Sequence, residues 1–309
     1  MKPLLLILLT SAICYPADWI AALDQARTAM NHGELVNAEQ ILNSTIDQAQ
    51  AKSGRNSTAL DEPLEMLAQV YQREKRYADA AAAEQQRLDI WTEAVGENGV
   101  MVARVLHQLS AVELQGANFS DAESNSRRAL AILTAAFVDK PPAAQSAVDL
   151  ADVLIAENRK DEAEQMLALA EKTFETSLGA TAMLTTGVTQ RRAAMLKQLG
   201  RTAEADQLTK TQARVVYKPN QATPPRIQSR VEPEYSEEAR KGKLNGSIQM
   251  SIVVDPTGAP TQIAVLRPLG MGLDEKAIEA VKQWKFTPGQ KSGTPVPVFT
   301  QIEITFHVL

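Results

Sequence analysis

The stretch from Leu269 to Gly289, LGMGLDEKAIEAVKQWKFTPG, decides the architecture of the C-terminal part of the chain. Its apolar residues recur at helical spacing and form one stripe along a helix predicted for residues 272–284. Asp274 and Glu275 in the first turn suit the positive end of the helix dipole, and Pro288-Gly289 ends the segment. The stripe consists of Leu273, Ala277, Ala280, Val281 and Trp284.

The runs on either side of this helix alternate between apolar and polar residues, as strands with one buried face do. We predict strands at about 247–254, 261–267 and 298–308, and a turn at 255–258 joins the first two. A short helix at 236–241 would precede them. The order α-β-β-α-β predicts an antiparallel sheet with one face covered by the helix at 272–284.

The C-terminal part of the chain, about residues 225–309, contains a set of spaced residues: Tyr235, Ala239, Gly246, Asp255-Pro-Thr-Gly258, Gly272-Leu-Asp274, Ala277, Ala280-Val281, Trp284-Lys-Phe286, Pro288, Gly293 and Pro295-Val296. Together they resemble the pattern of the TonB C-terminal domain family. Two loop positions differ from the usual pattern: Ser236 follows Tyr235 where the family usually has Pro, and Arg267-Pro-Leu-Gly270 replaces small hydroxyl residues. The resemblance implies a domain that binds a short segment of outer-membrane receptors and transmits force to them.

A small alanine recurs in the helical part of the chain, at successive spacings of 42, 42, 41 and 42 residues. A fixed period of this size predicts stacked helix hairpins, in which a small residue lets two helices approach closely. The pattern resembles the tetratricopeptide repeat (TPR) in a longer variant of about 42 residues. The alanines are Ala38, Ala80, Ala122, Ala163 and Ala205.

Five helix pairs are predicted, near 18–32/34–51, 58–74/76–94, 99–116/118–137, 142–158/160–178 and 181–199/201–216. Stacked hairpins form a concave groove that typically binds peptides or partner segments. We expect the first helix of each pair to line this groove; alternatively, its polar side chains are simply solvated. The candidate groove residues are Gln69, Arg73, Arg104, Gln108 and Asn158.

Together these patterns predict an α+β multidomain chain. An N-terminal all-α TPR-like solenoid precedes a small TonB-like α-β-β-α-β antiparallel sheet domain. We expect a signal peptide at 1–17, helical repeats at 18–217, a Pro-rich linker at 218–226 and the sheet domain at 227–309. The linker, KPNQATPPR, contains three prolines and has no periodicity.

The first residues have the features of a secretory signal. Lys2 precedes an apolar run at 4–13, which is shorter than the roughly 20 residues that a membrane-spanning helix needs. We predict cleavage between Ala12 and Ala17 and export to the periplasm. Two alternatives stay open: lipidation at Cys14, the single cysteine, or retention of the segment as an inner-membrane anchor.

The last predicted strand is the candidate partner-binding site. An edge strand offers unpaired N–H and C=O groups, to which an extended peptide can add; alternatively, the strand merely closes the core. The favoured function is an exported envelope protein that captures an extended receptor segment at this edge, with the TPR array as a scaffold. The candidate edge residues are Phe299, Gln301, Glu303, Thr305 and His307.

The alternative function is a working energy transducer for TonB-dependent outer-membrane transport, anchored by an uncleaved N-terminal segment. In both interpretations the partners are proteins or peptides, with outer-membrane TonB-dependent receptors as candidates. Membrane association through the N-terminus and a homo-oligomer formed by strand exchange are also open.

Composition and motifs argue against other classes of function. The formal net charge is −5, and no basic field is present to bind nucleic acid. His32, His107 and His307 fall in separate elements, and neither a zinc-binding HExxH nor a G-x-S-x-G or P-loop motif occurs. We therefore predict a protein that is not an enzyme and has no cofactor and no metal.

Overall fold

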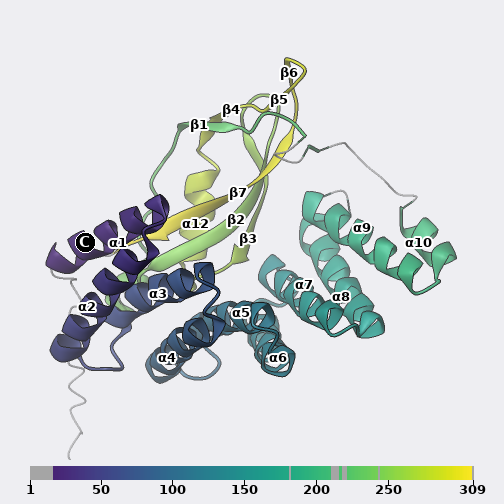
Figure 1. Cartoon of the computed structure of the whole chain (residues 1–309). Coiled ribbons are helices and arrows are strands. Elements are labelled where there is room, and N and C mark those ends of the chain that lie inside the picture. The colour runs from purple at the N-terminus through teal and green to yellow at the C-terminus, as the bar shows by residue number, and fades with distance from the viewer. Residues whose placement is uncertain (1–16, 181, 210–215, 218–220, 243, 308–309) are drawn as a thin grey trace, which may run out of the picture.

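The structure is a computed structural model, and it describes residues 17–180, 182–209, 216–217, 221–242 and 244–307. The signal peptide predicted at 1–17 therefore lies almost entirely outside the described residues. Most of the end of the helix predicted at 201–216 and the start of the linker predicted at 218–226 also lie outside them. The described part consists of an array of helix hairpins and an antiparallel sheet that lies against it (Figure 1).

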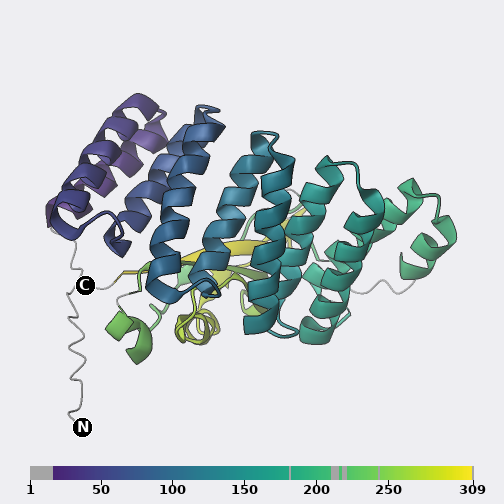
Figure 2. The same cartoon turned by 90° about the horizontal axis from the view of Figure 1, so that it is seen from below.

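The array contains five stacked helix pairs among the described residues, seen side by side in Figure 2. A 3-10 turn at Thr58–Leu60 precedes the third helix. The helices are α1 (Ala17–His32), α2 (Leu35–Ser53), α3 (Asp61–Arg73), α4 (Tyr77–Val95), α5 (Val100–Gln115), α6 (Phe119–Ala136), α7 (Pro141–Ala156), α8 (Lys160–Leu178), α9 (Met183–Gln198) and α10 (Thr202–Thr209).

The recurring alanines hold the hairpins together. Each of the five is 0% exposed, which agrees with the close helix approach expected of them. The turn inside each hairpin contains one residue with a left-handed backbone, and only two of these five are glycines. Asn158 is one of the three of these five residues that are not glycine, with φ 61°. The helix α7 ends at Ala156 and not at 158 as predicted, so Asn158 lies in the turn that follows it. The left-handed residues are Gly33, Lys75, Ala117, Asn158 and Gly200.

The sheet has the strand order β3-β2-β7. The strands are β2 (Gly246–Val254), β3 (Pro260–Arg267) and β7 (Val298–Phe306), and both pairings are antiparallel. The even-numbered apolar residues of β2 belong to the same buried cluster as Leu273, Ala277 and Val281 of α12 (Leu273–Val281). The short helix α11 (Glu237–Gly242) precedes the sheet, and Ser236 Oγ caps it by accepting the N–H of Ala239 at 3.0 Å.

Two details of the sheet region differ from the predictions. The helix predicted to reach residue 284 ends at Val281, and the indole Nε1 of Trp284 instead donates to the carbonyl of Val231 at 2.9 Å. Four short strands were also missed, because two to four residues are too few to show a period. They are β1 (Arg226–Ser229), which pairs with β4 (Lys285–Thr287), and β5 (Gln290–Lys291), which pairs with β6 (Thr294–Pro295).

The sheet lies against the side of the array that α3, α5 and α7 form, whereas α4, α6 and α8 lie on the far side (Figure 1). One buried apolar cluster contains residues of both parts. The guanidinium of Arg104 on α5 donates to the carbonyl of Ser247 on β2 at 2.7 Å. Arg267 on β3 forms an ion pair with Asp149 on α7 at 2.5 Å. These contacts fix the sheet over the first helices of the central hairpins.

Candidate functional site

The outer side of β7 is the edge of the sheet that the sequence pointed to. The N–H of Phe299 donates away from β2, to the carbonyl of Tyr217 at 2.9 Å. Because the β2–β7 register is continuous and antiparallel, every second residue from Phe299 also directs its backbone groups outward. Among the described residues, no other element forms a backbone hydrogen bond with this side beyond Phe299. Within the described part of the chain, the edge is therefore closed at one end by Tyr217 and open from Gln301 to Thr305.

The predicted edge residues lie together along this side. Phe299 is half-buried, whereas Gln301, Glu303, Thr305 and His307 are exposed. Thr305 shares a hydroxyl–hydroxyl hydrogen bond of 3.1 Å with Ser247 on the neighbouring strand. The carboxylate of Glu303 has no ion pair or hydrogen bond with any described residue. Peptide binding by these residues stays a prediction.

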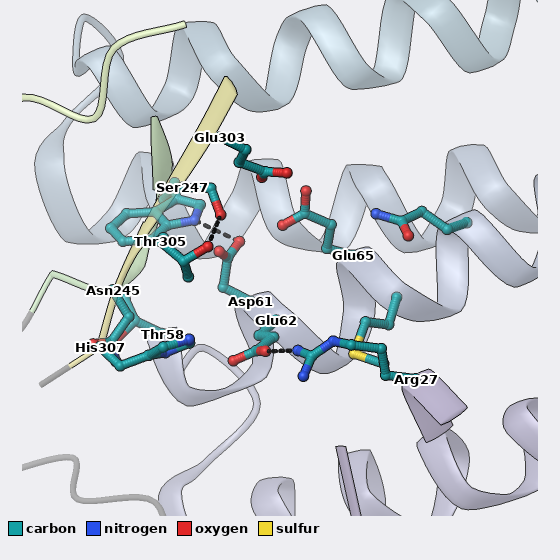
Figure 3. Close-up of a pocket in the computed structure, with 14 residues that line it drawn as sticks. Arg27, Thr58, Asp61, Glu62, Glu65, Asn245, Ser247, Glu303, Thr305 and His307 are labelled. Carbon is teal, nitrogen blue, oxygen red and sulfur yellow. Dashed lines mark hydrogen bonds and ion pairs between the residues drawn. The ribbon is translucent and has the colours of Figure 1, made fainter. Parts of the chain in front are cut away.

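A cavity of about 330 Å³ lies between this edge and the helices α1 and α3 (Figure 3). Its carboxylate-rich wall comes from one face of α3, on which Asp61, Glu62 and Glu65 point into the space that Glu303 faces from β7. The remaining lining residues are Arg27, Thr58, Met66, Gln69, Trp91, Asn245, Gly246, Ser247, Thr305 and His307.

A fully buried arginine holds part of this wall in place. Arg87 on α4 is 0% exposed and donates to Asp61 at 2.9 Å, to Glu65 at 3.2 Å and to Glu84 at 2.8 Å. The indole of Trp91 also donates to Asp61, at 2.7 Å. Burial raises the pKa of Glu84 to about 7, although Arg87 opposes this shift, and the surrounding carboxylates raise the pKa of Arg87.

The candidate groove residues have different surroundings. Arg104 binds Ser247 of the sheet, and the amide nitrogen of Gln108 donates to Glu65 at 2.6 Å. Arg73 donates to the carbonyl of Met30 at 2.7 Å, and Gln69 lines the cavity. Asn158 lies in the turn beyond α7, so it is not on a groove-lining helix.

The expected open groove is therefore occupied along α5 and α7 by the chain's own sheet. One buried apolar cluster includes residues of both parts, and the polar contacts of Arg104 with Ser247 and of Asp149 with Arg267 hold the sheet there. Of the concave side, the part next to α1 and α3 is hollow and adjoins β7.

A buried polar contact supports this docking. His107 on α5 is 5% exposed at its side chain, and its Nδ1 lies 3.3 Å from Asp149, which also binds Arg267. Burial, with the positive charge of Arg267, lowers the pKa of His107 to about 4, so this imidazole is neutral at physiological pH. His107 and Asp149 both belong to the array, and the ion pair of Asp149 with Arg267 links them to the sheet.

Sequence reasoning missed the α3 side of the cavity and the role of Tyr217. One signal could have revealed the first: Asp61, Glu62 and Glu65 fall at helical spacing on one face of α3. No sequence signal marks Tyr217, because its pairing with β7 joins residues about 80 positions apart.

Within the described ranges, no group of three or more His, Cys, Asp or Glu side chains is arranged to hold a metal ion. No helix in the same ranges has both the length and the apolar character needed to cross a membrane.

Comparison with known proteins shows which family the sheet region is similar to. Residues 231–308 match the model of the family described as Gram-negative bacterial TonB protein C-terminal. The C-terminal quarter is TonB-like. Protein TonB of Vibrio cholerae is 36% identical over 86 residues, which are 28% of this chain and 35% of that protein. The chain thus matches about a third of the length of this curated relative.

The helical part resembles solved TPR proteins. A Podosopora anserina protein described as a kinesin light chain with nearly identical TPR-like repeats is 18% identical, with a TM-score of 0.54. The match covers 62% of the present chain and 91% of the Podosopora anserina chain. BtubC (BKLC) from P. vanneervenii is also 18% identical, with a TM-score of 0.52 over 62% of this chain and 86% of that one. These similarities establish the TPR-like fold of the array.

Proposed function

We propose that this protein is a non-catalytic envelope protein of Gram-negative type that captures an extended segment of a partner protein. The partner segment adds to the outer side of β7, and the TPR-like array serves as a scaffold for the TonB-like part. The candidate partners are outer-membrane receptors, because residues 231–308 match the TonB C-terminal family.

The observation that carries the proposal is the open stretch of β7 from Gln301 to Thr305. Three residues there direct their backbone N–H and C=O groups away from β2, and the cavity below them provides space for a guest chain. A guest strand could form up to about six backbone hydrogen bonds with this edge, each with a net contribution of about 1 kcal/mol.

The test is site-specific photo-crosslinking in a Gram-negative envelope, with the full chain and a benzophenone side chain at Gln301. We expect a covalent adduct with an outer-membrane receptor. The matched control places the same group at Glu279, which lies on the solvent side of α12 with a side chain 64% exposed. Equal adducts at both positions, or none at Gln301, would contradict capture at β7.

A second variant tests strand addition itself. Glu303→Pro removes an outward N–H that takes no part in the β2 ladder, so the fold should survive. We expect the Gln301 adduct to fall at least about tenfold, because proline removes one guest hydrogen bond and disturbs its neighbours. Circular dichroism checks that Glu303→Pro is folded. An undiminished adduct in a folded Glu303→Pro protein would refute strand addition.

The similarity to Protein TonB of Vibrio cholerae supports a second candidate, an energy transducer that keeps its N-terminal segment in the inner membrane. Mass spectrometry of the mature N-terminus separates the two candidates. A chain that retains Met1 and fractionates with the inner membrane would favour the transducer, whereas a new N-terminus between Ala12 and Ala17 would favour the exported adaptor.

A further inference from the structure

The cavity beneath β7 has a chemical character that bears on which peptide the edge accepts. On the array-facing side of the sheet, Ser251 of β2 and Ala264 of β3 are buried, whereas Gln301 and Glu303 of β7 are exposed. The sheet thus touches the array along β2 and β3 and is separated from it at β7. The open backbone edge of β7 borders this space.

The lining of the cavity carries an excess of negative charge. Four carboxylates line it, against one arginine, Arg27, which is already paired with Asp24 and Glu62. Behind this wall, the buried Arg87 contacts Asp61, Glu65 and Glu84, and the half-buried Arg104 lies 3.7 Å from Glu65. The four carboxylates that line the cavity thus outnumber its one lining arginine.

The carboxylates differ in how far their charge is already compensated. Asp61 and Glu65 accept from Arg87, and Glu62 accepts from Arg27 at 2.9 Å. Burial and the neighbouring carboxylates Glu65 and Asp61 raise the pKa of Glu62, although His307 and Arg27 oppose this. Glu303 has no such partner among the described residues, and its carboxylate points into the space opposite Glu65 (Figure 3).

A guest strand on β7 would direct every second side chain into this cavity. Residues directly opposite one another on neighbouring strands project to the same face, with Cβ atoms about 4.5–5.5 Å apart. The guest residue opposite Glu303 therefore projects between Glu303 and the α3 carboxylates. The guest cannot extend past Phe299, because Tyr217 already occupies that position.

We propose that the partner segment is an extended peptide with a lysine or arginine at the position opposite Glu303. The inference rests on the proposed capture at β7 and specifies its ligand. A cationic side chain gains the attraction of Glu303 and Glu65, whereas an acidic side chain at the same position meets like charge. The TonB-like sheet supplies the backbone edge, and the TPR-like array supplies the wall that selects the charge.

The test uses the full-length protein and fluorescently labelled peptides of nine residues, with alternating Thr and Val around a single central Lys, Gln or Glu. Fluorescence anisotropy gives the affinity of each peptide. For the natural sequence we expect the Lys peptide to bind roughly two- to fivefold more tightly than the Gln peptide, and the Glu peptide to bind most weakly. The preference should shrink as salt is raised from low to high concentration, because exposed charges are screened.

Charge exchange at Glu303 makes the test specific. In Glu303→Lys, the Glu peptide should bind at least as tightly as the Lys peptide. Glu279→Lys, an equal change of net charge on α12, should keep the original order. If all three peptides bind the natural protein equally, strand capture stands and the charge preference is refuted. If none binds, both the capture and this inference are refuted; an unchanged order in Glu303→Lys refutes the role of the cavity.

Discussion

Arg87 is the most informative single position for the stability of the array, and we expect Arg87→Met to be severely destabilising. Its guanidinium is 0% exposed and donates to the carboxylates of Asp61, Glu65 and Glu84. Removing one partner of a buried ion pair costs about 3–5 kcal/mol, because the remaining charges stay buried without compensation. Asp61 and Glu65 can be partly rehydrated, since their side chains are 12% and 20% exposed. We therefore expect a loss of about 4 kcal/mol near pH 8.

The loss should become smaller at lower pH. The pKa of Glu84 is about 7 in the folded protein and near 4.5 when unfolded, so the folded state binds more protons between these values and stability rises as pH falls. As pH falls from about 8 to 5.5, proton uptake by Glu84 raises the free energy of unfolding of the natural protein by roughly 2 kcal/mol. Without Arg87 the pKa of Glu84 rises further, and the corresponding gain is roughly 3 kcal/mol. The cost of Arg87→Met should thus be about 1 kcal/mol lower at the acidic pH.

Urea unfolding followed by far-UV circular dichroism at both pH values provides the measurement. Arg76→Met is the matched control, because Arg76 also pairs with three carboxylates, those of Glu39, Glu74 and Asp79, but lies on the surface with 41% exposure. Its substitution should change the urea midpoint much less. A cost for Arg87→Met as small as that of the control, or one that is the same at both pH values, would refute the reasoning.

Two further substitutions test the docking of the sheet and a turn within it. Folding lowers the pKa of His107 from 6.5 to about 4, so the free energy of unfolding should fall by up to about 3 kcal/mol as pH drops from 6.5 towards 4. His107→Phe should flatten this dependence on pH, and urea unfolding across the same pH range measures it. An equally steep fall of stability with pH in His107→Phe would contradict the lowered pKa of His107. Gly258→Ala should cost about 2–4 kcal/mol, because Gly258 has φ 86° and a Cβ there would lie 2.0 Å from the carbonyl oxygen of Phe286. Gly293→Ala, with φ 80° and open space around the position, should cost only about 1 kcal/mol, and equal unfolding midpoints for the two variants would exclude the clash.

Local periodicity made much of the fold predictable. The recurring alanines marked the second helix of each pair, and all five of these helices begin within one residue of the predicted start. The strands β2, β3 and β7 were also found close to their bounds, because each runs for eight or nine residues with a repeating pattern. The short strands β1, β4, β5 and β6 were missed, since their pairing depends on neighbours elsewhere in the chain.

The edge of the sheet was predictable only in part. Gln301, Glu303 and Thr305 of β7, and His307 just beyond it, are exposed as the alternation indicated. The closure of that edge at Phe299 by Tyr217 was not foreseen, nor was the position of α3 beside it. Both depend on where distant segments pack, which no pattern within β7 encodes.

The sequence by itself determined the repeat period, the identity of the main helices and strands, and the order in which they occur, because each is recorded in the spacing of neighbouring side chains. Only the tertiary structure decided that the sheet lies in the groove of the array and that acidic residues of α3 face β7. Those features depend on pairs such as Arg104 and Ser247, which are 143 residues apart and meet only when the whole chain has folded.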